Sequence, residues 1–264
     1  MTQHTGTARV TGASSGIGAA YADQLAARGH DLILVARDEA RLRAAAERLG
    51  REGGVTVEVM SADLTRPEDL AVVRDRVATD AALRVLVNCA GLGPLGPALD
   101  SPASLYDGLL ELNIRALQTL SLAAATAFGD RGAGTVVNIS SAVAIIPERF
   151  NAPYAASKAF VLALTQGLGA ELAGKGVRFQ AVLPGATRTH FFDRTGADIG
   201  QIPSEMIMDA SDLVAAALAG LDAGETVTIP SLPDLGDWQA LEAARFRLGP
   251  NLSRSMPASR YGLG

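Results

Sequence analysis

The chain has 264 residues, of which 48% are hydrophobic and 19% are charged, and its formal net charge is −5 with a pI of about 5.3. This composition belongs to a globular protein with a sizeable core and excludes a disordered chain. The acidic balance argues against nucleic acid or an anionic membrane surface as a partner. Cys89 is the single cysteine, which excludes a disulfide within the chain, and His4, His30 and His190 lack the spacing of metal ligands, so we expect no metal site.

The sequence also lacks a membrane-spanning pattern. No run reaches the ~18–20 consecutive apolar residues that a spanning helix needs. Residues 1–7 are polar and contain no apolar signal segment. We therefore expect a soluble, cytoplasmic protein that has no membrane partner.

A glycine-rich turn, residues 11–18, lies between a short expected strand at 7–10 and a helix that ends near Gly29. Glycines let the backbone turn tightly and approach a ligand closely. The N-terminus of the following helix offers free N–H groups and a partial positive charge to a diphosphate. The spacing is Gly-x-x-x-Gly-x-Gly rather than the commoner Gly-x-Gly-x-x-Gly. We expect a dinucleotide-binding turn; a turn with only a structural role is the alternative.

Arg37 follows the second expected strand, residues 31–36, whose apolar run indicates burial on both faces of a parallel sheet. In a doubly wound sheet this position faces the adenosine ribose, where an acidic residue binds the 2′-hydroxyl of NAD and an arginine accommodates the 2′-phosphate of NADP. Arg37 therefore favours NADP(H) over NAD(H). Asp38 would oppose a phosphate unless its carboxylate points away, and a solvated Arg37 without a ligand is the alternative.

The rest of the chain continues the alternation of strands and helices. Further strands are expected at 55–60, 83–87, 134–141, 177–183 and 226–230, and further helices at 38–49, from Pro67 onward, and at 105–127, 154–172 and 211–221. This alternation predicts an α/β fold, a single Rossmann-like doubly wound domain with a seven-stranded parallel sheet and helices on both faces.

The domain is expected to span residues 1–232. Within it, residues 186–210 lack clear periodicity and are expected to form a mobile loop over the site. Residues 233–264 show no core pattern of their own. We expect them to form a tail that packs on the same domain or on a neighbouring subunit.

Tyr154 and Lys158 stand four residues apart, so a helix places them one turn apart on the same face. A tyrosine ionises near pH ~10 and is a poor base at neutral pH. A fixed positive charge beside the phenol would lower its pKa, which makes the pair suitable for moving a proton to or from a carbonyl or an alcohol. Taken alone, the spacing also fits a solvated helix face.

Several short motifs occur in one order along residues 11–189, and together they resemble the short-chain dehydrogenase/reductase family. They are the turn Thr11-Gly12-x-x-x-Gly16-x-Gly18, Asp63-Leu64, Asn88-x-Ala90-Gly91, Asn113, Ser141, Tyr154-x-x-x-Lys158, and Pro184-Gly185 followed by Thr187 and Thr189. Any one of these motifs is weak evidence. Their order, with Ser141 thirteen residues before Tyr154, makes the resemblance specific.

The resemblance implies a role for each matching residue. Tyr154 would be the acid/base, Ser141 would bond the substrate oxygen, Lys158 would hold the nicotinamide ribose and lower the pKa of Tyr154, and Asn113 would bend its helix and hold a water of the proton relay. The implied cofactor-binding residues, besides Arg37, Tyr154 and Lys158, are Gly12, Ser14, Ser15, Gly16, Ile17, Gly18, Asp63, Leu64, Asn88, Ala90, Gly91, Pro184, Gly185, Thr187 and Thr189. Ser140 is the rival of Ser141, and the spacing to Tyr154 favours Ser141.

The implied activity is an NADP(H)-dependent interconversion of a ketone or aldehyde and an alcohol by hydride transfer. A cofactor-binding sensor, or an epimerase or dehydratase on the same fold, are the alternatives. The substrate pocket is expected from residues 92–95, 142–150 and 187–208, whose apolar side chains indicate a hydrophobic substrate. These apolar side chains are Ile145, Ile146, Phe150, Phe191, Phe192, Ile207 and Met208.

The resemblance also implies a homodimer or homotetramer formed through the helices at 105–127 and 154–172. One residue departs from the family pattern: Cys89 stands where an asparagine is usual. We expect its thiol to be a small apolar group at the end of a strand. The backbone contact that the asparagine side chain would make there is then in doubt, but the chemistry is not. A redox role for Cys89 is the alternative.

Overall fold

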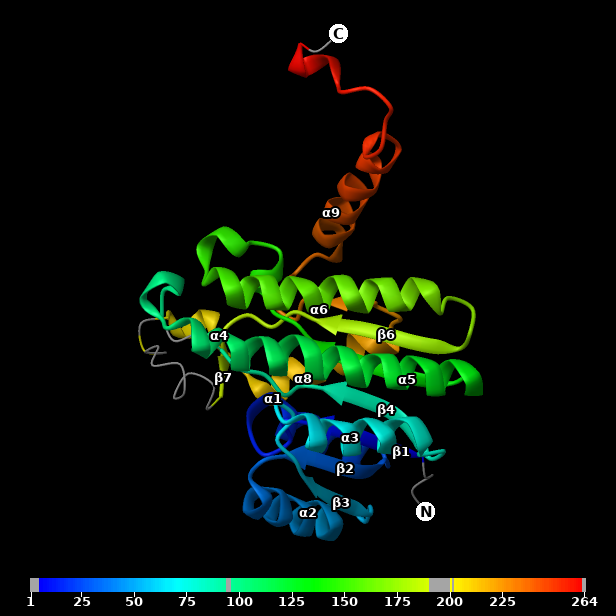
Figure 1. The fold of residues 1–264 in the computed structure, drawn as a ribbon. Helices are drawn as coiled ribbons and strands as arrows, with labels where there is room; N and C mark the ends of the chain where they lie inside the picture. Colours follow the sequence, from blue (N-terminus) through cyan, green and yellow to red (C-terminus); the bar gives the residue numbers. More distant parts are fainter. Residues whose placement is uncertain (1–4, 94–95, 190–199, 201, 263–264) are drawn as a thin grey trace. The chain divides into compact units, whose positions relative to one another are not determined.

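Seven parallel strands form the central sheet of the protein, described here by a computed structural model that covers residues 5–93, 96–189, 200 and 202–262 (Figure 1). The strand order is β3-β2-β1-β4-β5-β6-β9. The strands are β1 Thr7–Thr11, β2 Asp31–Ala36, β3 Val57–Ser61, β4 Leu83–Asn88, β5 Gly134–Ile139, β6 Val177–Val182 and β9 Val227–Thr228. The predicted seven-stranded parallel sheet is confirmed, and two short strands, β7 Thr187–Arg188 and β8 Met208–Asp209, pair separately.

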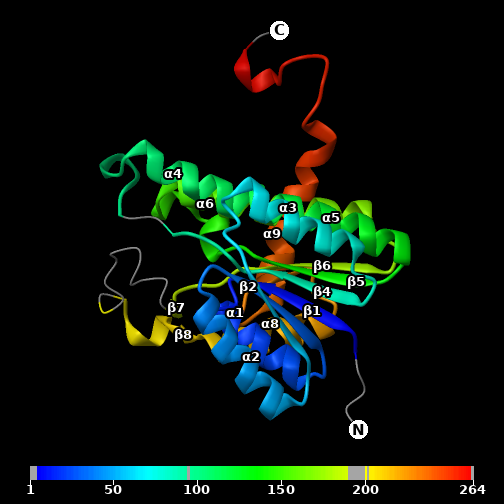
Figure 2. The ribbon, with the colours of Figure 1, turned by 60° about the horizontal axis from the view of Figure 1, so that its bottom comes forward.

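Helices cover both faces of this sheet, as Figure 2 shows. One face carries α1 Gly16–Ala27, α2 Glu39–Gly53 and α8 Ala210–Asp222. The other face carries α3 Pro67–Thr79, α4 Ala103–Leu110, α5 Leu117–Arg131 and α6 Ala152–Glu171. Single-turn 3₁₀ segments lie at Ala98–Asp100, Ala142–Ala144, Pro147–Arg149 and Ser204–Met206.

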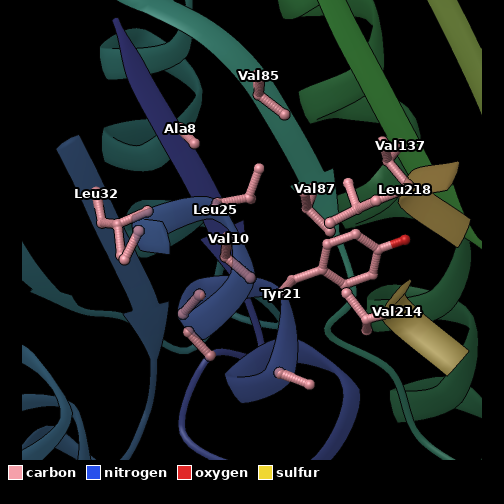
Figure 3. Packing of buried hydrophobic residues seen from close by; sticks show 14 of the residues in the cluster. Ala8, Val10, Tyr21, Leu25, Leu32, Val85, Val87, Val137, Val214 and Leu218 are labelled. Carbon is pink, nitrogen blue, oxygen red and sulfur yellow. The ribbon is translucent and has the colours of Figure 1, made fainter. Parts of the chain in front are cut away.

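The alternation of side chains along each strand divides the core into two apolar layers. On β2, Leu32 and Leu34 point into the layer under α1, α2 and α8, whereas Ile33 and Val35 point into the layer under α3 and α5. In the first layer Tyr21 of α1 packs beside residues of β4 and α8, such as Val87, Val214 and Leu218 (Figure 3). Burial on both faces explains why the strands read as continuous apolar runs.

The order of the strands reverses between β1 and β4, because β2 and β3 lie on one side of β1 and β5, β6 and β9 lie beyond β4. In open α/β sheets such a reversal leaves a crevice outside the carboxyl ends of the strands, where ligands bind. The Thr11 hydroxyl joins the two strand ends: it donates to the Val87 carbonyl (3.4 Å) and accepts from the N–H groups of Cys89 (3.0 Å) and Ala90 (3.1 Å).

The helix expected at 105–127 is longer and interrupted. Residues 103–131 form one helical rod in which Glu111–Ala116 is a π-helical segment between α4 and α5. Asn113 lies inside this segment and is buried. A π segment inside an α-helix widens the turn locally and is frequent at functional sites.

Residues Ser231–Gly264 form a second compact unit, separate from Met1–Pro230. The sequence did not lead us to expect regular structure here, but residues Leu235–Leu248 form α9. The Asp234 carboxylate caps this helix by accepting from Gly236 N–H at 2.8 Å. Where this unit packs stays a prediction. In the described part of the chain, no helix combines the length and apolar character needed to cross a membrane.

Candidate active site

A cavity of about 630 Å³ opens at the carboxyl ends of the strands, at the point where the strand order reverses. Most of the site residues expected from the sequence line it together. They are Gly12, Ser14, Ser15, Gly16, Ile17, Arg37, Asp63, Leu64, Ala90, Gly91, Ser141, Tyr154, Lys158, Pro184, Gly185, Thr187 and Thr189. Residues separated by up to 177 positions in the sequence (12 and 189) thus meet in one cavity.

The glycine turn is shaped so that a ligand can approach its backbone. Gly12 has a φ of +69°, and a Cβ there would lie 3.0 Å from the Ala90 backbone. A Cβ on Gly18 would overlap the Gly12 carbonyl oxygen. The Ser15 side chain makes no capping hydrogen bond to α1 in the described structure. The first N–H groups of α1, at Gly16 and Ile17 in the cavity wall, therefore suit a diphosphate.

Arg37 lies at the cavity wall with its side chain 61% exposed, so a ligand can reach the guanidinium. Its Nη1 is 4.0 Å from Asp63 Oδ2. Asp38 also lines the cavity, but its carboxylate caps α2, accepting from Arg41 N–H at 3.0 Å, and lies 3.1 Å from Arg41 Nε. The Asp38 carboxylate, which could have repelled a phosphate at Arg37, thus interacts with the N-terminus of α2 and with Arg41.

Tyr154 lies in the first turn of α6 and shares a hydrogen bond with the Ser141 side chain. Ser141 Oγ also lies 3.4 Å from the Pro184 carbonyl. Ser140 points elsewhere, since its hydroxyl donates to the Lys158 carbonyl at 2.7 Å. The partner of Tyr154 is therefore Ser141, as the spacing favoured.

Lys158 lies close to Tyr154, with its Nζ 5.8 Å from the centre of the phenol ring. The same Nζ donates to the Ile139 carbonyl at 3.0 Å. Burial lowers the pKa of Lys158 to about 8, with Cys89 acting in the opposite direction. Burial also raises the pKa of Tyr154 to about 12, against the effect of the Ser141 hydrogen bond. The expected lowering of the Tyr154 pKa by Lys158 is wrong, because burial disfavours the phenolate and Lys158 is not among the groups that shift this pKa. Tyr154 is consequently a protonated phenol, the form that donates.

Asn113 fastens the loop after β4 to the helical rod. Its Oδ1 accepts from Leu92 N–H (2.8 Å), while Nδ2 donates to the Leu92 carbonyl (2.9 Å) and to Ser157 Oγ (3.2 Å). Ser157 in turn donates to the Tyr154 carbonyl at 2.7 Å. A Cβ on Gly91 would lie 3.3 Å from Asn113 Oδ1 and 3.6 Å from Lys158 Nζ. Asn113 thus stands behind the cavity, close to Lys158 and Tyr154.

Two of the expected cofactor-binding residues, Gly18 and Asn88, do not line the cavity. Gly18 supports the turn from behind. The Asn88 amide donates to Ser121 (3.1 Å) and Asn138 (2.9 Å) within the layer between the sheet and α5. This geometry gives Asn88 a role in packing the strand ends rather than in contacting a ligand. His190 lies outside the described residues.

The apolar part of the cavity wall agrees with the expectation at Leu92 and Gly93 and differs from it elsewhere. Leu92, Gly93, Leu105, Leu109 and Leu112 line it, whereas no residue of 142–150 does. The three helical leucines recur at positions i, i+4 and i+7, which places them on one face. That spacing was the signal in the sequence that could have found them. Phe191 and Phe192 lie outside the described residues.

Cys89 also lines the cavity, and burial raises the pKa of its thiol to about 12, with Lys158 opposing the shift. A thiol with this pKa carries almost no thiolate at neutral pH, and the thiolate is the reactive form. The structure therefore favours the apolar role of Cys89 over a redox role.

The site and the fold agree with comparisons to known proteins. A family model described as short chain dehydrogenase matches residues 6–200. Galactitol 2-dehydrogenase (L-tagatose-forming) of Cereibacter sphaeroides is 38% identical over 184 residues, which cover 69% of this chain and 71% of that protein. The chain therefore belongs to the short-chain dehydrogenase family and is an oxidoreductase of that family, as the sequence predicted.

Two solved structures are similar over nearly the whole chain. A short-chain dehydrogenase from Sphingobium yanoikuyae in complex with NADPH is 47% identical, with a TM-score of 0.94 over 97% of this chain and 99% of that one. A bulky-bulky ketone specific alcohol dehydrogenase from Comamonas testosteroni is 44% identical, with a TM-score of 0.89 over 98% of this chain and 99% of that one. Both similarities include the second unit as well as the sheet.

Proposed function

We propose that the protein is an NADP(H)-dependent oxidoreductase that interconverts a ketone or aldehyde and an alcohol, with Tyr154 as the proton donor and acceptor. The observation that carries the proposal is the hydrogen-bonded pair of Tyr154 and Ser141, which lies beside Lys158 in the same cavity as the glycine turn and Arg37. These groups supply a proton donor, an oxygen-binding hydroxyl and a dinucleotide cradle around one space.

The residues of the site divide the chemistry among them. A bound nicotinamide cofactor would supply or accept the hydride. Ser141 and Tyr154 hold the substrate oxygen by hydrogen bonds, and Tyr154 gives its proton to that oxygen as negative charge develops. Lys158, whose Nζ donates to the Ile139 carbonyl, would hold the ribose of the cofactor. In alcohol oxidation, Tyr154 takes the proton back.

NADP(H) is favoured over NAD(H) by the chemistry at the end of β2. Arg37 offers an exposed guanidinium, which binds phosphate oxygens in a bidentate manner. The Asp38 carboxylate is already engaged by the N-terminus of α2. The NADPH in the similar Sphingobium protein supports the same choice.

The substrate is proposed to be a hydrophobic ketone or alcohol. Leucine side chains form part of the cavity wall, and such a wall favours an apolar group beside a carbonyl held at Tyr154. The bulky ketones named for the Comamonas protein are consistent with this assignment.

The first test follows absorbance at 340 nm while NADPH is mixed with benzil, cyclohexanone and a wider panel of ketones, aldehydes and alcohols. Turnover is expected, and Tyr154→Phe is expected to abolish it while NADPH still binds, because the phenyl ring keeps the shape but cannot donate a proton. Retained turnover in Tyr154→Phe would remove the proposed acid. If the wild type gives no absorbance change with any compound, the oxidoreductase proposal fails, and a sensor, or an epimerase or dehydratase, is favoured instead.

The second test concerns the choice of cofactor. Arg37→Ala is expected to raise the KM for NADPH by about tenfold, since a charge-assisted hydrogen bond of roughly 1.5 kcal/mol is lost, and to leave the KM for NADH nearly unchanged. Arg43→Ala is the control, since Arg43 lies in α2 with its side chain 68% exposed and does not line the cavity. Equal effects of Arg37→Ala on both cofactors would remove the case for NADP(H).

A homodimer or homotetramer formed through α5 and α6 is also proposed, with Leu122 of α5 43% exposed on the surface of that layer. Light scattering after size-exclusion chromatography gives the mass directly, and a monomer would contradict the proposal. The cytoplasmic location expected from the sequence stays a prediction.

A further inference from the structure

Asn151 joins α6, the helix of Tyr154, to α4 and to the segment that precedes it. It is the N-cap of α6, and its Oδ1 accepts from the Tyr154 N–H at 3.1 Å. The same side chain uses its Nδ2 to donate to the Gly96 carbonyl (2.9 Å) and to the Tyr106 hydroxyl (3.1 Å). Tyr106, on α4, donates onward to the Ala98 carbonyl at 3.2 Å. We call these contacts of Asn151, Gly96, Tyr106 and Ala98 the Asn151 bridge.

The bridge contacts Gly96 and Tyr106, which lie within the segment that forms the apolar wall. Asn113 holds the start of this segment by its two hydrogen bonds to Leu92. Tyr106 shares α4 with Leu105 and Leu109, which line the cavity. The polar contacts of Asn151 and Asn113 therefore fix the leucine wall relative to the first turn of α6, where the reacting hydroxyl lies.

The residue type suits this double task. A side chain at this position must accept from a backbone N–H of the first helical turn and donate twice in other directions. An asparagine amide has an acceptor oxygen and two N–H donors, whereas an aspartate carboxylate has no donor. Serine caps a helix about as well as asparagine, but its hydroxyl is too short to keep both donor contacts. Capping alone would thus not require asparagine.

We propose that Asn151 is a positioning residue that sets the distance between the leucine wall and the Tyr154 hydroxyl, and thereby the size of ketone that the site accepts. The inference rests on the proposed ketone reduction. The bridge itself can also be tested without turnover, because it should slow amide hydrogen exchange in residues 96–106.

Two substitutions break the bridge and leave the cap of α6 in place. Asn151→Ser keeps a capping oxygen and removes both donors, and Tyr106→Phe removes the hydroxyl without changing α6. In both variants we expect the ratio of kcat/KM for benzil to that for cyclohexanone to rise on the order of tenfold, mainly because the KM for cyclohexanone increases. The pH profile of kcat and the Kd for NADPH should stay as in the wild type. The double variant should add little to either single change, because both remove one unit.

Asn151→Ala is the comparison in which the cap is lost as well, so kcat for both ketones should fall together. If Asn151→Ser lowers kcat equally for both ketones, as Asn151→Ala does, Asn151 acts only as a cap and the inference fails. Ratios within twofold of the wild type in both bridge variants would also overturn it.

Amide hydrogen exchange of the ligand-free protein separates the bridge from the proposed reaction. Exchange in residues 96–106 should be faster in Asn151→Ser and Tyr106→Phe than in the wild type, and residues 31–36 of β2 provide the internal control. If the wild type reduces no ketone, the proposed function fails while exchange still decides on the bridge. Unchanged exchange in both variants would overturn the bridge itself.

Discussion

Two parts of the cavity wall, the glycine turn and the leucine wall, are built in different ways. At the glycine turn the shape is set by the backbone, with Gly12 in a left-handed conformation and Gly18 against the Gly12 carbonyl oxygen. At the leucine wall the shape is set by side chains of α4 and the following π segment. A backbone surface leaves little room for substitution, whereas a side-chain surface can change with one residue. The wall at the glycine turn is therefore constrained, and the leucine wall is adaptable.

The sharpest test of the backbone-built end is Gly18→Ala. The added Cβ overlaps backbone rather than a flexible side chain, so the turn must shift. Overpacking of this kind costs about 1–3 kcal/mol, which corresponds to a fall in NADPH affinity of roughly 5- to 150-fold if the turn carries the cost. Isothermal titration calorimetry measures the affinity, and circular dichroism checks that the variant is folded.

The matched control for Gly18→Ala is Gly167→Ala in α6. A Cβ at Gly167 meets no atom within 4 Å, and alanine is a better helix residue by about 1 kcal/mol. This control should therefore bind NADPH normally and unfold at a slightly higher temperature. Equal NADPH affinities in Gly18→Ala and Gly167→Ala would contradict the constrained character of the turn.

The buried Lys158 makes the free energy of unfolding depend on pH. Its pKa in the folded protein, about 8, lies below the ordinary 10.5 because the ammonium is buried. Between these pH values the unfolded chain binds more protons, so the free energy of unfolding rises with pH through this window, by up to about 3 kcal/mol. Lys158→Met has no such group and should lack that rise. Urea unfolding at pH 7 to 10 measures it, and parallel pH profiles of the two proteins would contradict the burial of a charged Lys158.

The smallest expected effect is at the leucine wall. Leu105→Ala removes part of the apolar surface at the cavity, so kcat/KM for cyclohexanone should fall by about fivefold, equivalent to roughly 1 kcal/mol of lost contact, while that for benzil should change less. Leu110→Ala is the control, since Leu110 is 45% exposed and does not line the cavity. If both variants lower kcat/KM for cyclohexanone equally, α4 affects the site only through its stability.

Much of the fold could be predicted because parallel strands buried on both faces need continuous apolar runs, and residues 31–36 and 134–139 have them. The ends of some strands differ from the predicted ones, because pairing with the neighbouring strand determines where a strand begins. For example, β3 begins at Val57, two residues later than expected, where it pairs with Leu32. The helix α9 was missed because its apolar residues do not follow one face.

The sequence predicted that Tyr154, Lys158 and Arg37 belong to one site, and all three line one cavity, while their roles stay proposals. Properties that depend on packing were not predictable. The direction of the Tyr154 pKa follows from burial, which spacing in a sequence does not reveal. The leucine wall depends on which face of α4 turns toward the cavity. The link from Asn151 to Gly96 joins residues 55 positions apart.

The Thr11 hydroxyl has a consequence for how this chain can vary over evolution. Because Thr11 Oγ1 receives the N–H groups of both Cys89 and Ala90, the backbone after β4 is anchored from β1 and not by the side chain at position 89. Position 89 is thereby released from an anchoring duty, and a cysteine can replace the family's asparagine without loosening the strand end. The substitution that position 89 accepts thus depends on Thr11, which lies 78 residues earlier in the sequence.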